Sequence, residues 1–567
     1  MMTGIATRRL GLLLPVLVVL SIGYLAPMAA IAWTSLHRVG HLSLGAYVEV
    51  LSSLTFLRIL LRTLSIAGIV TAICVVSGYL LAYWAATRAR SWARSIMALV
   101  MVPYLTSVLI RSYAWIVILG GDGLINHTLL ALGLIETPLP LVFSSTGNII
   151  GMVHILLPLA VLPIYAGMRQ IAPSLLLAAQ SLGGGAASVF VTVFLPLSIP
   201  GVVAGAALVF LSAVGFYITP ALLGAPGDYL MAQAIEVRVS TLAEFDVAAA
   251  LAWLLLLLVG SGLIVFSRQI VPLPKENASG NSRHRRTGIG LGLSAPRPLI
   301  ELAEAGGWVL ARFLPVAAIA LLAFLLAPMV VVLLIAFSNA PYLTFPPPGY
   351  SWRWVQVFVH DGQWLDSLWF SLRLAGAAAL TCLAVGTPYA LALTRGHFRG
   401  RRLLWLLAVS PMILPHIIIG LGFFFAAVAI GMNGRAASFW LAYTVIGLPY
   451  VVIILVSALG RFDINLERAA VNLGASPLTA LATITVPILA ASFAGAFLFA
   501  FLAGFDDLII SLFLSTPRGT TIAIRIWEDI RLEISPKTAV VGLFQVGVVL
   551  IGLAGMTIMR HVRRPKG

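Results

Sequence analysis

Two stretches of the chain, LLAAQSLGGGAASVFVTVFLP at residues 176–196 and ERAAVNLGASPLTALATITVP at residues 467–487, follow the same pattern. They align without a gap at an offset of 291 residues. The identical positions include Ala178, Ala179, Leu182, Gly183 and Pro196 in the first stretch and Ala469, Ala470, Leu473, Gly474 and Pro487 in the second. The pattern predicts a short helix, a glycine at which the chain turns, a second short helix, and a proline where the next helix begins.

The chain around these stretches repeats itself as well. Leu25-Ala26-Pro27-Met28 recurs as Leu326-Ala327-Pro328-Met329. A second group of identical positions, all at an offset of 308 residues, consists of Ala67, Gly68, Cys74, Gly78 and Pro103, matched by Ala375, Gly376, Cys382, Gly386 and Pro411. Because separate matches in one register indicate a duplication, we expect two related halves, residues 1–267 and 313–567, joined by a polar cytoplasmic linker at 268–312.

The composition places most of the chain in lipid. Of its 567 residues, 60% are hydrophobic and 10% are charged, and the mean hydropathy is +1.05. A soluble domain has about 25% charged residues, so a soluble enzyme and a disordered protein are both excluded. The net charge of +16 comes from basic residues in short tracts between long apolar runs. This distribution is typical of membrane orientation signals rather than of nucleic-acid binding.

Apolar runs long enough to cross a bilayer occur throughout the chain. A hydrocarbon core of roughly 30 Å needs about 20 apolar residues per helix. Twelve runs meet this requirement, near residues 10–33, 58–86, 95–119, 146–169, 199–223, 247–267, 313–337, 366–394, 403–429, 438–459, 488–512 and 537–559. The expected fold is therefore an all-α integral membrane protein with about twelve transmembrane helices in two parallel six-helix repeats. The first run resembles a signal peptide, but it is longer than a usual signal core, and we expect it to remain as the first helix.

The basic residues set the expected orientation. Basic residues without any acid occur in both tails and in the loops 87–94 and 395–402; they are Arg8, Arg9, Arg88, Arg90, Arg94, Arg395, Arg399, Arg401, Arg402, Arg560, Arg563, Arg564 and Lys566. Acids gather in the alternate loops. By the positive-inside rule both termini are then cytoplasmic, as an even number of spans requires.

The two repeated stretches resemble the EAA loops of importer-type ABC transporter permeases, the binding-protein-dependent transport inner membrane component family with the MetI-like fold. In that family the loop forms a coupling helix that fits a groove on a separate ATPase subunit. The resemblance covers nearly the whole chain, once per half, and implies a permease of a bacterial inner (plasma) membrane that binds two copies of a cytoplasmic ATPase. The coupling residues that it implies are Leu177, Ala178, Ala179, Gly183 and Pro196 in the first half and Glu467, Arg468, Ala469, Ala470, Gly474 and Pro487 in the second.

Both stretches depart from the family pattern at the acid that names it. Leu177 occupies its place in the first half and Arg468 in the second, while Glu467, one position earlier, is the only acid in either motif. The run Gly183-Gly184-Gly185 should also soften the first turn. We therefore expect two docking sites of unequal strength, with the second better anchored.

The chain has no phosphate-binding loop of its own. None of its three lysines follows a glycine, so Gly-x-x-x-x-Gly-Lys-Ser/Thr does not occur. The resemblance implies that ATP and Mg²⁺ are used by the partner ATPase and that a soluble periplasmic binding protein captures the substrate. No catalytic residue, metal site or nucleic-acid partner is expected, and lipid surrounds the chain. The alternative is an ion-coupled secondary transporter with twelve helices, which explains the span count but needs no pair of matching loops.

Three tracts within the spans narrow the substrate class. Residues 111–115 and 215–224 resemble the first permease of spermidine/putrescine-type systems, and residues 505–511 resemble the second, so the chain looks like those two permeases fused. The candidate residues of the substrate pathway are Arg111, Tyr113, Trp115, Tyr217, Thr219, Asp506 and Asp507. An acidic wall suits a cationic polyamine such as spermidine or putrescine. Two alternatives stay open: one aspartate caps a helix or pairs with Arg111 and never contacts the substrate, or the substrate is ferric iron, a phosphonate, thiosulfate or an opine.

Overall fold

The computed structural model describes residues 11–38, 40–270, 297–341, 343–396, 398, 400–516, 519–533 and 535–562. This part of the chain is almost entirely helical, which confirms the all-α class, and its one sheet is a hairpin of β1 (His37–Arg38) and β2 (His41–Leu42). Some residues used for the expected orientation and linker lie outside the described part: Arg8, Arg9, residues 271–296, Arg399, Arg563, Arg564 and Lys566.

The helices on either side of the gap at 271–296 form two series. The first series is α2 (Leu14–Leu20), α3 (Ala26–Ser35), α4 (Gly45–Ser52), α5 (Leu54–Ala86), α6 (Arg90–Tyr104), α7 (Val108–Leu119), α8 (Leu124–Ala131), α9 (Ser145–Met168), α10 (Pro173–Ser181), α11 (Ala186–Val189), α12 (Leu195–Val214), α13 (Ile218–Leu223), α14 (Met231–Ser240) and α15 (Phe245–Ile270). The second series is α16 (Arg297–Ala336), α17 (Arg353–His360), α18 (Gly362–Arg395), α19 (Arg401–Ile413), α20 (His416–Ala429), α21 (Ala436–Leu459), α22 (Asn465–Asn472), α23 (Pro477–Ala480), α24 (Val486–Ile488), α25 (Ala490–Phe505), α26 (Ile509–Leu514), α27 (Ile522–Leu532) and α28 (Lys537–Val562). Short segments of other helix types are η1 (Gly11–Leu13), η2 (Ser21–Leu25), η3 (Phe190–Phe194) and η4 (Leu481–Thr485).

The two series repeat each other in order. The starts of α4 and α5 are matched 308 residues later by those of α17 and α18, and the start of α9 is matched 291 residues later by that of α21. Helices α5, α9 and α12 pack together in the first series, and α18, α21 and α25 pack together in the second. Small residues bring these helices close: a Cβ on Gly78 would lie 3.2 Å from the Cβ of Ala160, and a Cβ on Gly386 would lie 2.8 Å from Val451. Close packing through small residues is typical of membrane bundles.

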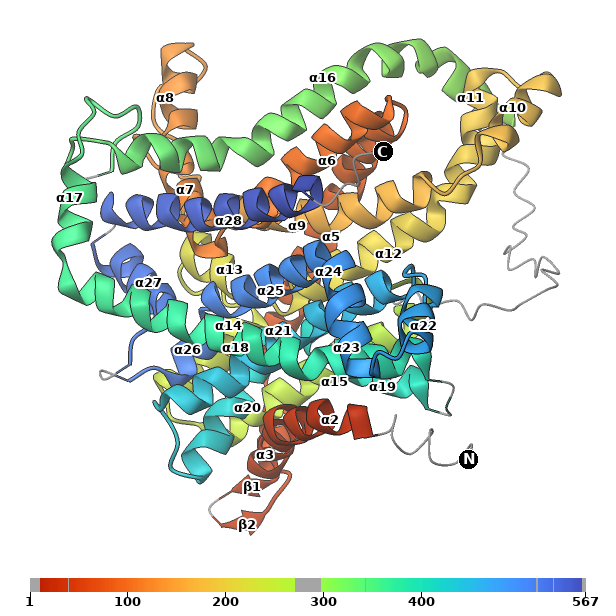
Figure 1. Cartoon of the computed structure of the whole chain (residues 1–567). Coiled ribbons are helices and arrows are strands. Elements are labelled where there is room, and N and C mark those ends of the chain that lie inside the picture. The colour runs from red at the N-terminus through yellow and green to blue at the C-terminus, as the bar shows by residue number, and fades with distance from the viewer. Residues whose placement is uncertain are drawn as a thin grey trace.

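Each series places its first candidate span, Gly11–Ser35 or the span within α16, against the other series. Helix α3 contacts α20, while η1 and α2 contact α18 and α21. Conversely, α16 contacts α5, α6 and α7. Figure 1 shows α16 along the top edge of the molecule and α2 and α3 along the bottom edge. The two series are therefore interlocked.

The expected number of twelve spans is not confirmed. Within the described residues, nine helices are long and apolar enough to cross a membrane, or up to eleven if each of two bent pairs forms one span. Four of the expected spans contain a break, at residues 105–107, 215–217, 414–415 and 506–508. The bend between α19 and α20 reaches 97°, and there Leu414 has the extended ψ of 143° that a residue before a proline favours. Hydropathy measures apolar length and not direction, so it does not reveal such breaks.

Candidate functional site

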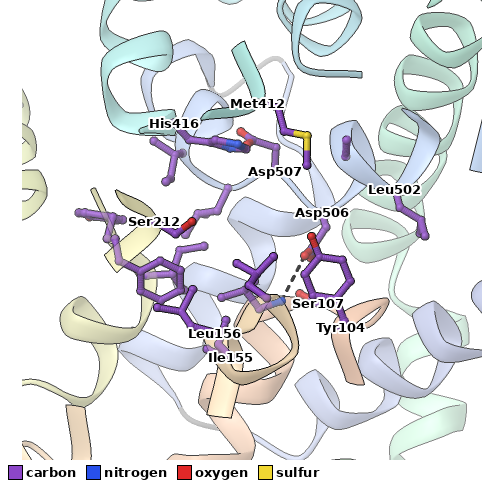
Figure 2. Close-up of a pocket in the computed structure, with 18 of the residues that line it drawn as sticks. Tyr104, Ser107, Ile155, Leu156, Ser212, Met412, His416, Leu502, Asp506 and Asp507 are labelled. Atoms are coloured by element: carbon purple, nitrogen blue, oxygen red, sulfur yellow. Dashed lines mark hydrogen bonds and ion pairs between the residues drawn. The ribbon is translucent and has the colours of Figure 1, made fainter. Parts of the chain in front are cut away.

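The four helix breaks meet around one central cavity. Its volume is about 300 Å³, and residues from all four breaks line it. The titratable and polar side chains on its wall come from both series; they include Tyr104, Arg111, Tyr217, His416, Tyr450, Asp506, Asp507 and Gln545. Figure 2 shows Asp506 beside Tyr104 and Ser107, and Asp507 beside His416. A cavity between two membrane bundles, with a few polar groups on an apolar wall, has the form of a solute pathway.

Asp506 links the two series across the cavity. Its Oδ2 accepts a hydrogen bond of 3.1 Å from the backbone N–H of Val108, the first residue of α7, drawn as a dashed line in Figure 2. The side chain of Ser107, which precedes α7, makes no capping bond. Because the first N–H groups of a helix lack partners within that helix and carry partial positive charge, a carboxylate stabilises them. Asp506 thus caps a helix of the other series.

Asp507 is bound more tightly than its neighbour. Its side chain is 2% exposed, its Oδ1 accepts from the N–H of Ile510 at 2.7 Å, and its Oδ2 accepts from Nδ1 of His416 at 2.7 Å. Ile510 belongs to the first turn of α26, and His416 is the first residue of α20. Asp507 therefore holds the starts of two helices together within the second series.

A glycine occupies the position of Asp506 in the first series. Gly215, 291 residues earlier, lies against Pro415 in the break between α19 and α20: a Cβ at Gly215 would lie 2.4 Å from the Cβ and Cγ of Pro415. No side chain fits at that distance, so this crossing between the series depends on the missing Cβ. Ser107 and Pro415 are also equivalent, 308 residues apart. The cavity is thus lined by two equivalent crossings, one polar and one apolar.

Arg111 is the buried cation of the cavity wall. The residue is 3% exposed, its Nε donates to the backbone oxygen of Ser107 at 3.4 Å, and its Nη1 has no hydrogen-bond partner among the described residues. The part of the chain that the structure describes contains no ion pair between Arg111 and Asp506. The expected alternative of an Asp–Arg111 pair is therefore not present, although both groups line the same cavity.

The remaining predicted pathway residues divide into two groups. Tyr217 lines the cavity and lies 5.8 Å from Trp527, measured between ring centroids. Tyr113 donates to the backbone oxygen of Ser535, Trp115 packs against a histidine and a phenylalanine, and Thr219 bonds to a neighbouring serine. These three side chains are not part of the cavity wall.

Sequence reasoning missed four of the polar side chains named above on the wall, those of Tyr104, Tyr450, His416 and Gln545. His416 looked isolated in sequence, because its partner Asp507 is 91 residues away. Gln545 on α28 is buried, and neither atom of its amide has a hydrogen-bond partner among the described residues. His416 is equivalent to Val108, at the offset of 308 residues, and each directly follows a helix break in the structure.

The two repeated stretches form two surface loops of the same shape. The first surface loop (residues 173–196) consists of α10, a turn at Gly183, α11, η3 and the start of α12; the second surface loop (residues 465–487) consists of α22, a turn at Gly474, α23, η4 and α24. The two glycines have φ of +90° and +95°, in the left-handed region that favours glycine. Figure 1 shows α10, α11 and α22 toward the same, right-hand end of the molecule.

Both surface loops present uncovered small and apolar side chains. Leu182 and Leu473, equivalent residues beside the turns, are each 89% exposed. Ala178 and Ala469 are exposed, and Ala179 and Ala470 are half-buried; Leu177 and Arg468 are exposed. Pro196 and Pro487 lie in the first turns of α12 and α24. An exposed leucine beside a glycine turn, twice at one end of the molecule, is suited to contact with another protein.

The anchoring of the two surface loops differs. In the second, Glu467 is 9% exposed and its carboxylate contacts Arg395 and Thr485. Burial alone raises the pKa of Glu467, but the hydrogen bonds from Arg395 and Thr485 and the charge of Arg395 outweigh it and hold that pKa below its ordinary value. In the first, Leu176 stands at the equivalent position and packs against apolar neighbours.

Two of three comparisons with known proteins found similar chains. No protein-family model matches the chain. The spermidine/putrescine transport system permease protein PotB of Escherichia coli (strain K12) is 34% identical over 226 residues, which are 40% of this chain and 82% of PotB. The putrescine transport system permease protein PotI of the same organism is 29% identical over 251 residues, which are 43% of this chain and 89% of PotI. A crystal structure of a bacterial ABC transporter involved in the import of alginate is similar over 46% of this chain and 92% of that chain, with 18% identity and a TM-score of 0.38. Each relative thus accounts for less than half of this chain.

Proposed function

The chain belongs to the permease family of ABC importers, and we propose that it supplies both permease halves of an importer for polyamines such as spermidine or putrescine. It is a multi-pass membrane protein and a transport subunit, and ATP hydrolysis belongs to a separate subunit of such a system. The single observation that carries the proposal is the pair of equivalent surface loops at one end of a duplicated membrane protein.

The proposed arrangement divides the chain into residues 1–267, a linker at 268–312, and residues 313–567. Both termini, the linker and the two surface loops lie in the cytoplasm, and the membrane is the bacterial inner membrane. The basic residues at the starts of α6 and α19, Arg90, Arg401 and Arg402, support this orientation by the positive-inside rule. The halves enter the membrane in the same sense, so the cavity lies on the path between them.

The partners follow from the surface loops. Each loop binds one copy of a cytoplasmic ATPase, which uses ATP and Mg²⁺, and a periplasmic binding protein delivers the substrate. The two positive-φ glycines support this role because they expose the alanines and leucines beside them without a covering side chain. ATP binding draws the two loops together, and the helices that leave the loops carry this movement to the cavity.

The charge of the cavity supports a cationic substrate. Asp506 and Asp507 contribute two carboxylates to the wall, and Arg111 contributes one cation. Asp506 is only half-buried, so an ammonium group in the cavity can reach its carboxylate. Attraction between opposite charges is strong where little water is present, and the names of the relatives point to the same substrate class.

Reconstitution tests the proposal. The purified chain is expected to bind the ATPase encoded with it in stoichiometric amounts and to move spermidine into liposomes only with the ATPase, ATP and the binding protein present. Transport by the chain alone, driven by an ion gradient, would instead establish a secondary transporter. The ligand that copurifies with the binding protein distinguishes a polyamine from ferric iron, a phosphonate, thiosulfate or an opine.

A substitution at the turn tests the role of the loops. Gly474→Val places a β-branched residue at φ of +95°, where it is strained. We expect ATP hydrolysis to become uncoupled from uptake while the protein remains inserted. Gly183→Val is the matched variant in the first loop, and normal uptake by both variants would contradict the docking role.

A further inference from the structure

We propose that Glu467, Arg395 and Thr485 form an internal anchor that positions α22, so that Glu467 acts inside the permease and does not contact the ATPase. This inference rests on the proposed function, because it assigns a role within the second docking loop. In the aligned motif Glu467 is the one acid that could have been presented to a partner. Its side chain instead contacts Arg395 and Thr485 of the same chain.

The carboxylate of Glu467 is fully engaged by its own chain. Its Oε2 accepts from Nη1 of Arg395 at 2.7 Å, and its Oε1 accepts from Nη2 at 2.6 Å. The hydroxyl of Thr485 donates to Oε1 as well. The side chain of Glu467 is 12% exposed, whereas the next residue, Arg468, is exposed. A bidentate pair with both oxygens occupied leaves no free acceptor for a partner protein.

The anchor joins α22 to two helices that reach deep into the protein. Arg395 is the last residue of α18, which has 34 residues. Thr485 is the last residue of η4, from which the chain continues through α24 into α25. Helix α25 ends at Phe505, directly before Asp506 on the cavity wall. A push on α22 is therefore passed by the anchor directly to α18, and through η4, α24 and the 79° bend before α25 toward the cavity.

The first surface loop lacks these groups at the equivalent positions. Thr87, Leu176 and Phe194 stand in place of Arg395, Glu467 and Thr485. Aromatic rings take over the attachment there: the rings of Tyr83 and Phe194 meet edge to face at 5.3 Å between centroids. The charged anchor is thus a property of the second loop, and it gives a physical reason for the expected inequality of the two docking sites.

The decisive measurement uses the permease without its ATPase. The side chain of Leu473 is exposed and lies beside the turn, and the native Cys74 and Cys382 are buried, so Leu473→Cys gives one labelling site. A spin label at this position, with the full chain in lipid nanodiscs, reports the mobility of the second loop. Glu467→Gln should raise the mobile population about tenfold or more, because charge-assisted bonds are replaced by neutral ones.

Two further variants keep the test specific. Exchanging the partners, Glu467→Arg with Arg395→Glu, should restore the low mobility, which a merely structural loss would not allow. Arg461→Gln is the matched control, because it removes an exposed charge near the start of α22 and should leave mobility unchanged. If the exchanged pair fails to insert, Thr485→Val removes one bond of the anchor and should give a smaller increase in the same direction.

The complete complex supplies the functional readout. With ATPase and binding protein added, Glu467→Gln should still bind ATPase but lose about tenfold of the stimulated ATP hydrolysis. Unchanged label mobility in the permease alone, with altered behaviour only when ATPase is present, would overturn the inference and assign Glu467 to the ATPase contact. Failure of the proposed function is a separate result, because then even the unaltered chain binds no ATPase.

Discussion

Where the two halves meet at the cavity, the second half contributes a carboxylate to the first, whereas the first contributes a bare glycine to the second. Asp506 caps α7 through the N–H of Val108, while Gly215, its equivalent, lies against Pro415. The backbone plan of the two crossings is shared, and their chemistry is not. Only the crossing made by Asp506 can respond to a charged solute, because the other depends on shape alone.

The surface loops of the two halves differ in the same direction. The second surface loop is held by the ion pair of Glu467 with Arg395, and the first by the packing of Leu176 and by the rings around Phe194. At the cavity wall and in the surface loop, the charged side chains thus belong mainly to the second half. Arg111 on the cavity wall is the exception, because it belongs to the first half. After a duplication, one copy can keep a contact by shape while the other gains an electrostatic role.

The largest effect is expected at the apolar crossing. Gly215→Val adds atoms where even a Cβ would lie 2.4 Å from Pro415, so the halves cannot close. Overpacking of about 3 kcal/mol corresponds to a loss of uptake on the order of a hundredfold. The loss is measured as substrate uptake by liposomes that contain the reconstituted complex. Gly68→Val is the control, because nothing lies within 4 Å of a Cβ at that position, and equal uptake by both variants would show that the crossing need not close.

A smaller and more selective effect is expected at the polar crossing. Asp506→Asn keeps an acceptor for the N–H of Val108 but removes the charge, so the KM for a polyamine should rise about tenfold with little change in the amount of inserted protein. Asp507→Asn should instead reduce the amount of folded protein, because Asp507 is buried and bonded to Ile510 and His416. Titration of uptake against substrate, beside quantitative detection of both variants, separates these outcomes. If Asp506→Asn lowers only the amount of inserted protein and leaves the KM unchanged, the proposed difference between Asp506 and Asp507 is wrong.

Acid should loosen one surface loop and not the other. The pKa of Glu467 is held below its ordinary value of 4.5, so its stabilising contribution is complete above 4.5 and is lost as pH falls through the lower, folded-state pKa. Spin labels at Leu473→Cys and at its equivalent, Leu182→Cys, compare the two loops directly. We expect the label at 473 to gain mobility by a few-fold in acid, and the label at 182 to remain as it was, since the first loop is held by apolar contacts. A parallel response of both labels would remove the distinction.

The smallest effect is expected from trimming the aromatic attachment. Phe194→Leu keeps an apolar side chain but loses the edge-to-face contact with Tyr83, which is worth about 0.5–1.5 kcal/mol. The thermal midpoint of the detergent-solubilised chain should fall by a few degrees, and coupling of ATP hydrolysis to uptake should remain. Loss of coupling from this change alone would mean that the first loop is as sensitive as the second.

The sequence predicts the all-α class, the duplication and the loops well, because these depend on apolar run length and on local turn chemistry. It also identifies Asp506 and Asp507 as polar groups in an apolar setting. It does not predict the partners of Asp506 and Glu467. The N–H of Val108 is 398 residues from Asp506 in the sequence, and Arg395 is 72 residues from Glu467. The breaks that form the cavity are hidden for a different reason: α6 and α7, or α19 and α20, read as one apolar run each, and apolar run length carries no information about direction.

The interlocking of the two series has a consequence for biogenesis. Helix α3 packs on α20, yet about 380 residues separate the end of one from the start of the other. At roughly 5–20 residues per second of translation, the early helix stands in the bilayer for about 20–80 s before its neighbour is synthesised. During that interval its contact face is open to lipid, insertion factors or a second nascent chain. Because both bundles belong to one polypeptide, the same ribosome that made α3 also makes its neighbour α20.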